Sequence, residues 1–132
     1  MSEELGVVGG TLGRCPDTPN CVQTGLRHPE GTKALYLAGG LDRGDVMRRL
    51  RTVVESSLRA RVVTETDRYL HAEVTSLIFR FVDDLELFIT DSDELVVRSA
   101  SRIGRSDLGA NGRRVEQLRT ALAEAQLLVT SD

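Results

Sequence analysis

The sequence has no tryptophan and few other aromatic residues. Two tyrosines and three phenylalanines make up only 4% of its 132 residues, which argues against the aromatic platforms on which proteins stack nucleic-acid bases. The net charge of −3 also argues against broad nucleic-acid binding, because such domains are usually basic. No apolar run approaches the roughly 20 residues that a bilayer-spanning helix needs. We therefore expect neither a nucleic-acid partner nor a membrane partner.

Cysteine is also scarce. Cys15 and Cys21 are the only two, with five residues between them. This spacing is neither that of a thioredoxin-like CxxC nor that of a zinc site, and no third cysteine could complete such a site. The loop allows a disulfide, which would contribute roughly 2 kcal/mol in the chain-entropy model. A structural loop with packed free thiols is the first interpretation, and a disulfide, a redox role and a metal role are the alternatives to it.

The first residues carry acidic side chains where a signal peptide would need basic ones. We therefore expect a cytoplasmic protein. The sequence indicates neither a metal nor another cofactor.

The chain length fits one domain, and 40% hydrophobic with 28% charged residues is typical of a globular protein. All three prolines and half of the glycines come before residue 34. Because such residues interrupt regular elements, residues 1–33 are predicted to form an irregular N-terminal arm that carries the Cys15/Cys21 loop. Residues 34–132 are predicted to form a single α+β domain.

Two helices and an antiparallel sheet follow from the pattern of apolar residues. Asp42 and Asp45 have the spacing of a capping box, and the apolar residues after them keep the helical period to about Arg59. A second helix is expected from about 111 or 112 to 128, with Asn111 as its N-cap. Alternation or β-branched residues predict strands over 61–66, 68–79, 85–90 and 94–101, with a further short strand over 33–39. Short connections imply a meander of four or five strands, on which both helices pack.

An arginine-rich stretch, residues 98–119, suggests a binding site. Its arginines stand among serines and glycines just before the second helix. Forked guanidinium donors and the free N–H groups of a helix start both suit carboxylate or phosphate. We therefore predict that an anionic small molecule or an acidic peptide binds here. The candidate ligand-binding residues are Arg98, Ser101, Arg102, Arg105, Asn111 and Arg113.

The same arginines could instead be tied to carboxylates inside the fold. Asp83 and Asp84 belong to a preceding acidic block, where a hairpin turn is expected, and Asp107 lies within the basic block. Buried arginines need such partners. In this interpretation the protein is a structural or protein-interaction module with an internal Arg–Asp network, and its partner would be another protein.

An enzyme is a further hypothesis. His71 and Glu73 share one face of a predicted strand, and such a pair can orient an imidazole as a general base. Asp83 and Asp84 could instead supply the carboxylates of an active site, opposite the arginines. Neighbouring residues of a strand point to opposite faces, however, so a shared metal would require a turn there. No serine stands in a nucleophile-elbow pattern, and the catalytic residues, if any, stay unknown.

Three blocks of the sequence resemble a known family. They are CPDTPNCVQT, YLHAEVTSLIFRFVDDLELFI and VRSASRIGRSDLGANGRRVEQLR, which together run from about Cys15 to Arg119. They are similar to the signature blocks of a bacterial and plastid family called domain of unknown function 1499. The resemblance implies no reaction, because the family has none assigned. A basic residue often follows the asparagine in members, whereas Gly112 stands there in this chain, which leaves Arg113 and Arg114 as candidates.

Overall fold

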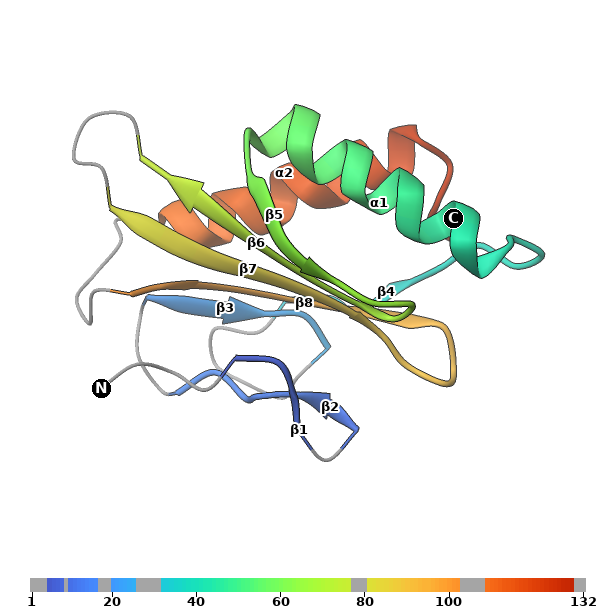
Figure 1. The fold of residues 1–132 in the computed structure, drawn as a ribbon, viewed down its shortest axis with the longest axis horizontal. Helices are drawn as coiled ribbons and strands as arrows, with labels where there is room; N and C mark the ends of the chain where they lie inside the picture. The colour runs from blue at the N-terminus through green and yellow to red at the C-terminus, as the bar shows by residue number, and fades with distance from the viewer. Residues whose placement is uncertain are drawn as a thin grey trace.

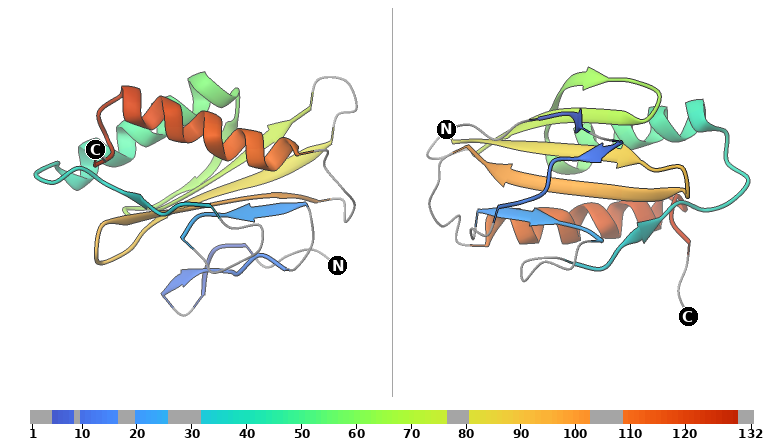
Figure 2. Two further views of the ribbon diagram at one scale, coloured as in Figure 1. Left: turned by 180° about the vertical axis from the view of Figure 1, so that it is seen from behind. Right: turned by 90° about the horizontal axis from the view of Figure 1, so that it is seen from below.

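Two helices lie on one face of an antiparallel sheet, and the N-terminal residues lie on the opposite face (Figure 1). The computed structural model describes residues 5–8, 10–16, 20–25, 32–76, 81–102 and 109–129. The view from behind shows the same three layers, and the view from below shows β1 and β2 in front of the sheet (Figure 2). The predicted α+β fold, an antiparallel sheet packed with two helices, is confirmed.

The sheet has six strands, all paired antiparallel. Its order is β3-β8-β7-β6-β5, and β4 pairs with the other end of β8. The bounds are β3 (Cys21–Gln23), β4 (Leu35–Tyr36), β5 (Arg61–Glu65), β6 (Tyr69–Thr75), β7 (Val82–Ile89) and β8 (Glu94–Ser101). Strands β5 to β8 form the predicted meander. A separate two-stranded sheet contains β1 (Val7–Val8) and β2 (Thr11–Leu12).

Helix α1 (Arg43–Leu58) begins and ends as its sequence indicates. The Asp42 carboxylate accepts a hydrogen bond of 3.1 Å from the Asp45 backbone N–H, which satisfies one free donor of the first turn. Arg59 follows the helix with φ of 55° and closes it in the left-handed conformation.

Helix α2 (Ala110–Glu124) begins differently from the prediction. Its N-cap is Gly109, with φ of 83°, and no side chain caps it. The assignment of Asn111 as N-cap is therefore wrong. Asn111 lies in the first turn, fully buried, and its amide bonds to other elements instead.

The hydrophobic core lies between the helices and the sheet. Alternation along β6, β7 and β8 turns one apolar set toward the helices, including Leu70, Leu85 and Val97. The helices meet it with fully buried leucines such as Leu50 and Leu118. The other face of the same strands is therefore free to carry polar residues.

Two sequence-based boundaries differ from the structure. Strand β7 begins at Val82 rather than at 85, so Asp83 and Asp84 lie within a strand and not in a turn. The range 1–33, predicted to be irregular, contains β3, which pairs with β8 through Cys21, Val22 and Gln23. The backbone of β8 offers hydrogen-bonding groups on that side, and a three-residue strand satisfies them despite the neighbouring glycines and prolines.

Neither helix in the described part of the chain is both long and apolar enough to cross a membrane.

Candidate functional site

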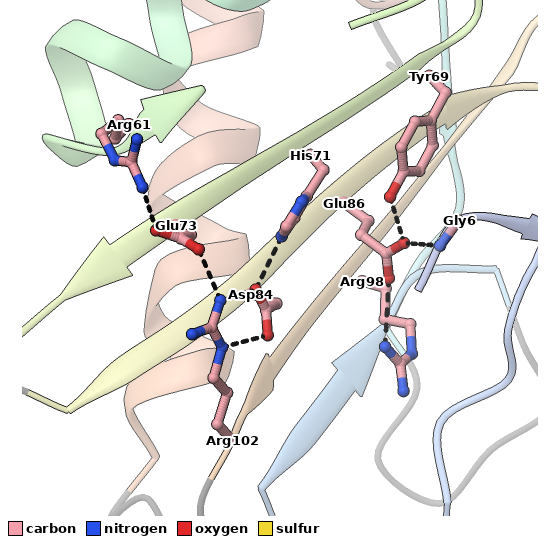
Figure 3. Close-up of polar contacts among 9 residues, drawn as sticks. All are labelled: Gly6, Arg61, Tyr69, His71, Glu73, Asp84, Glu86, Arg98 and Arg102. Atoms are coloured by element: carbon pink, nitrogen blue, oxygen red, sulfur yellow. Dashed lines mark hydrogen bonds and ion pairs between the residues drawn. The ribbon is translucent and has the colours of Figure 1, made fainter. Parts of the chain in front are cut away.

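Titratable side chains form a row on the outer face of the sheet, the face that the helices do not cover. Strand β6 contributes Tyr69, His71 and Glu73, which alternate along it as predicted. Strand β7 contributes Asp84 and Glu86, two residues apart. The register pairs Glu73 with Asp84 and His71 with Glu86, so the two sets lie side by side. Arg98 of β8 and Arg102, just beyond it, complete the row (Figure 3).

One half of this row, which we call the Asp84 cluster, contains His71, Glu73, Asp84 and Arg102. Asp84 accepts a hydrogen bond of 2.7 Å from His71 Nε2. It also accepts two of 2.9 Å from Arg102, from Nε to Oδ2 and from Nη2 to Oδ1. Arg102 Nη2 bonds to Glu73 Oε2 at 2.7 Å as well, and Arg61 reaches the other oxygen of Glu73 at 2.7 Å. The fork of Arg102 therefore has a fixed orientation.

These contacts change the acidity of the groups involved. Burial alone would raise the pKa of Asp84, but hydrogen bonds from His71 and Arg102 outweigh it and lower that pKa to about 2. The pKa of Glu73 is lowered chiefly by its hydrogen bonds from Arg102 and then Arg61. The same bonds, first from Asp84, raise the pKa of Arg102. The cluster therefore holds two ionised carboxylates and a permanently charged guanidinium at neutral pH.

Asp84 can only accept hydrogen bonds when ionised, so His71 Nε2 carries the proton between them. In the neutral imidazole this leaves Nδ1 as an acceptor. His71 and the Asp84 side chain are each exposed over less than a tenth of their surface. The pair thus has the orientation that a general base requires, although both side chains are nearly buried.

The other half, which we call the Glu86 cluster, contains Tyr69, Glu86 and Arg98. Glu86 is fully buried and accepts hydrogen bonds from the Tyr69 hydroxyl at 2.6 Å and from Arg98 Nη1 at 3.2 Å. The backbone N–H of Gly6 donates to it at 2.7 Å. Burial, followed by the hydrogen bond to Glu86, raises the pKa of Tyr69. This cluster is closed off by the N-terminal residues.

A third set of polar residues lies on the opposite, helix-covered face, and we call it the Asn111 network. Asn111 Nδ2 donates to Ser101 Oγ at 2.9 Å and to the Asn20 carbonyl at 3.1 Å. Its Oδ1 accepts from Arg114 Nη1 at 2.7 Å, and Arg114 also forms an ion pair with Asp83 at 2.9 Å. The network ties the start of α2 to the ends of β7 and β8.

The structure separates the residues that the sequence placed in one candidate ligand site. Arg98 and Arg102 lie on the outer face, whereas Ser101 and Asn111 bond to each other on the helix-covered face. Arg113 lies exposed in the first turn of α2. Arg105 and Asp107 fall outside the described residues. Alternation along β8 explains the split, because side chains an odd number of positions apart face opposite sides.

The predicted supporting carboxylates also separate. Asp83 pairs with Arg114 and Asp84 with Arg102, each on its own face of the sheet. His71 and Glu73 share the outer face with Arg102. Glu73 bonds to Arg102 directly, whereas His71 bonds to Asp84, which in turn bonds to Arg102. Cys15 and Cys21 form a disulfide, with their Cα atoms 5.7 Å apart. Among the described residues, no three His, Cys, Asp or Glu side chains are arranged to hold a metal ion.

Sequence reasoning did not find Arg61 as a partner of Glu73 or the bond from Tyr69 to Glu86. The alternation along β6 already put Tyr69 on the same face as His71. The missing information was the register between β6 and β7, which decides the neighbours across the strands.

The fold and these clusters define a small α+β domain whose sheet buries ionised side chains on its outer face. The chain belongs to the family described as protein of unknown function, DUF1499, whose pattern matches residues 11–122. No curated protein is similar enough in sequence to count as a match.

Proposed function

We propose that the protein binds an anionic small molecule or an acidic peptide at the Asp84 cluster, with the guanidinium of Arg102 as the main contact. The observation that carries the proposal is the fixed fork of Arg102. Its Nε and Nη2 are held by Asp84 and Glu73, whereas its side chain is 46% exposed. Within the described part of the chain, no acceptor is bonded to Nη1. A pre-oriented donor loses little side-chain entropy when a ligand arrives.

The charge of the cluster indicates how it would recognise a ligand. The two guanidiniums of Arg61 and Arg102 face the two carboxylates of Glu73 and Asp84, so the charges balance when His71 is neutral. Attraction by excess positive charge is therefore weak. Recognition would rest on the geometry of charge-assisted hydrogen bonds to carboxylate or phosphate oxygens.

A thermal-shift titration with inorganic phosphate and with a dicarboxylate tests this proposal. We expect a saturable rise in Tm for the native protein, since a ligand that binds only the folded state stabilises it. Arg102→Ala should abolish the rise relative to its own ligand-free Tm. Arg102→Lys keeps the charge but loses the fork, and should weaken binding strongly.

Arg61→Ala is the matched control for Arg102→Ala. Arg61 bonds to the same carboxylate, Glu73, but its side chain is 75% exposed and makes no bond to Asp84. The ligand-induced rise should therefore persist in Arg61→Ala. A rise that survives Arg102→Ala, or the absence of any rise in the native protein, would refute binding at this cluster. The internal Arg–Asp pairs would then favour the structural or protein-interaction module.

A second candidate function, acid–base catalysis, is supported by the 2.7 Å bond between His71 and Asp84. We propose Nδ1 of His71 as the base in that case, because Asp84 holds the proton on Nε2. The chain has only two histidines, so His28→Gln leaves His71 as the single imidazole. Nitrogen NMR of that variant should show that the neutral form of the ring carries its proton on Nε2. A ring protonated at Nδ1 alone would exclude this role.

The cytoplasmic location stays a prediction, as do the absence of nucleic-acid and membrane partners. The disulfide between Cys15 and Cys21 bears on location, because disulfides persist mainly in oxidising compartments. Thiol trapping of the protein in freshly lysed cells would decide the redox state that it has there.

A further inference from the structure

The described N-terminal residues, 5–8 and 10–16, lie over part of the outer face, and we call them the cover. In Figures 1 and 2 they lie across the sheet on the side opposite the helices. Among the described residues, β1 and β2 pair only with each other and share no ladder with the main sheet. The cover is held by side-chain contacts instead. The Gly6 N–H donates to Glu86, the Cys15 N–H donates to Gln23 Oε1 at 2.8 Å, and Leu12 packs into an apolar cluster.

The groups under this cover are charged or polar. Glu86 and Arg98 are almost completely buried, and Tyr69 is 8% exposed. Removing an ion pair from water costs free energy that apolar side chains of similar size would not require. Groups with strongly perturbed ionisation are common where a protein acts on a ligand, and the raised pKa of Tyr69 marks this place. The Glu86 cluster therefore resembles a site that is closed rather than a layer built only for stability.

A disulfide ties the cover to the sheet, in addition to the chain that joins Cys15 to Cys21. Cys15 belongs to the N-terminal residues, and Cys21 is the first residue of β3, opposite Ala100 of β8. The two cysteines pack with Ala100 in a small cluster of their own on the outer face. Without the disulfide, the contacts of Cys15 within the described part of the chain would be this packing and one hydrogen bond to Gln23. Segments with so few contacts open locally at low free energy.

We propose that the Cys15–Cys21 disulfide is a redox lock on this cover, and that its reduction by a dithiol opens the cover and exposes Tyr69, Glu86 and Arg98. The site that opens would extend the Arg102 site, so this regulatory role rests on the proposed function. Cys15 and Cys21 are 4% and 1% exposed, so a thiolate of the dithiol attacks one sulfur of the pair during a local opening of the cover and forms a mixed disulfide. The second thiol of the dithiol then displaces the protein sulfur. Two electrons and two protons pass to Cys15 and Cys21, which become thiols, and the dithiol becomes a disulfide.

Amide hydrogen exchange of the full chain, oxidised and after reduction with dithiothreitol, tests the opening. We expect exchange at Gly6 and Cys15 to accelerate by about tenfold or more after reduction, since both amides then exchange from an open cover. The amides of α1 and of β6 to β8 should keep their protection. Unchanged exchange at Gly6 and Cys15 would overturn the proposal. Loss of protection throughout the chain would overturn it as well, because the disulfide would then hold the whole fold.

The double variant Cys15→Ala with Cys21→Ala separates opening from any other effect of the reductant. It should show the same pattern without dithiothreitol, and a fully protected Gly6 in this variant would also refute the lock. Leu12→Ala is the matched control, because it loosens the cover but leaves the disulfide in place. In that variant Cys15 should stay protected until the disulfide is reduced.

Tyrosine fluorescence gives a second readout. The chain has two tyrosines and no tryptophan, so Tyr36→Phe leaves Tyr69 as the only strong emitter. Quenching of Tyr69 by acrylamide should rise severalfold on reduction, and an unchanged quenching constant would contradict exposure of the Glu86 cluster. Neither readout needs a ligand. The lock can therefore fail while phosphate still binds through Arg102, and binding can fail while the cover still opens.

Discussion

The two faces of the sheet use different chemistry at neighbouring positions of the same strands. In β7, Leu85 and Glu86 are both fully buried. Leu85 packs among apolar side chains beneath the helices, whereas Glu86 is surrounded by hydrogen-bond donors beneath the N-terminal residues. A residue of each kind thus reaches the same degree of burial for a different physical reason.

This difference indicates where the protein can respond to its surroundings. Apolar packing is non-directional and does not depend on protonation. The outer face depends on ionised groups, on the geometry of their hydrogen bonds and on a cover whose contacts with the sheet include one disulfide. Changes of pH, redox state or ligand should therefore act mainly on the outer face, whereas the helix-covered face is mostly apolar and has the Asp83–Arg114 ion pair near the start of α2.

The largest effect is expected from a cavity on the helix-covered face. Leu85→Ala should lower the free energy of unfolding by about 2–5 kcal/mol, because the removed side chain leaves a cavity in a closely packed core. The loss should be nearly the same at about pH 7 and about pH 3, since no titrating group is removed. Urea denaturation at both values measures it. A loss that depends strongly on pH would show that the two faces are not independent.

The next effect concerns Asp84, on the outer face. Its pKa is about 2 in the folded protein, against 3.8 as its ordinary value. The ionised form therefore adds roughly 2 kcal/mol of stability above that ordinary value, and this contribution is lost as the pH falls through 3.8 toward 2. The free energy of unfolding, measured by urea across this range, should fall for the native protein and less steeply for Asp84→Asn.

Leu85→Ala serves as the control for this titration. Its stability should start lower but fall in parallel with that of the native protein, because its Asp84 is unchanged. If the native protein and Asp84→Asn lost stability in parallel on acidification, Asp84 would not be the group that titrates.

Much of the fold could be predicted because the signals are local. The capping pair Asp42 and Asp45 fixes the start of α1, since donor and acceptor are three residues apart. Strand β8 has the bounds that its β-branched run indicated. The alternation of Tyr69, His71 and Glu73 along β6 needs only the period of a strand.

The candidate site was harder to predict because its contacts are remote in sequence. Asn111 looks like a helix cap, yet its amide bonds to the carbonyl of Asn20, which lies 91 positions away. Arg102 belongs with Asp84 and Glu73 only through the register of three strands. The redox state of Cys15 and Cys21 stayed open in the sequence, since five intervening residues are compatible with a disulfide or with free thiols.

A smaller effect is expected from the hydroxyl of Tyr69. Tyr69→Phe keeps the ring in its apolar cluster but removes the 2.6 Å bond to Glu86. The free energy of unfolding should fall by about 1–2 kcal/mol, since a buried carboxylate loses one donor and keeps two others. Thermal and urea denaturation measure the change. Tyr36→Phe is the control, because Tyr36 is half exposed, and it should change the free energy of unfolding little. An equal loss in both variants would argue against a special role for the bond between Tyr69 and Glu86.

The smallest effect should come from Arg61, and it sharpens the comparison within the outer face itself. Arg61 and Arg102 hold the two oxygens of the same carboxylate, Glu73, each at 2.7 Å. The Arg61 side chain is 75% exposed, so water and salt screen its pair with Glu73 and the side chain loses entropy when it is held there. Arg61→Ala should therefore lower the free energy of unfolding by about 0.5 kcal/mol or less.

Arg102→Ala should lower the free energy of unfolding clearly more, because Asp84 is nearly buried and would lose two hydrogen bonds. Urea denaturation of the two single variants measures the two losses, and a double-mutant cycle of Arg102→Ala with Asp84→Asn measures the part that comes from Asp84. Equal losses in Arg61→Ala and Arg102→Ala would mean that the two bonds to Asp84 add no stability, and they would contradict a fixed orientation of the Arg102 guanidinium.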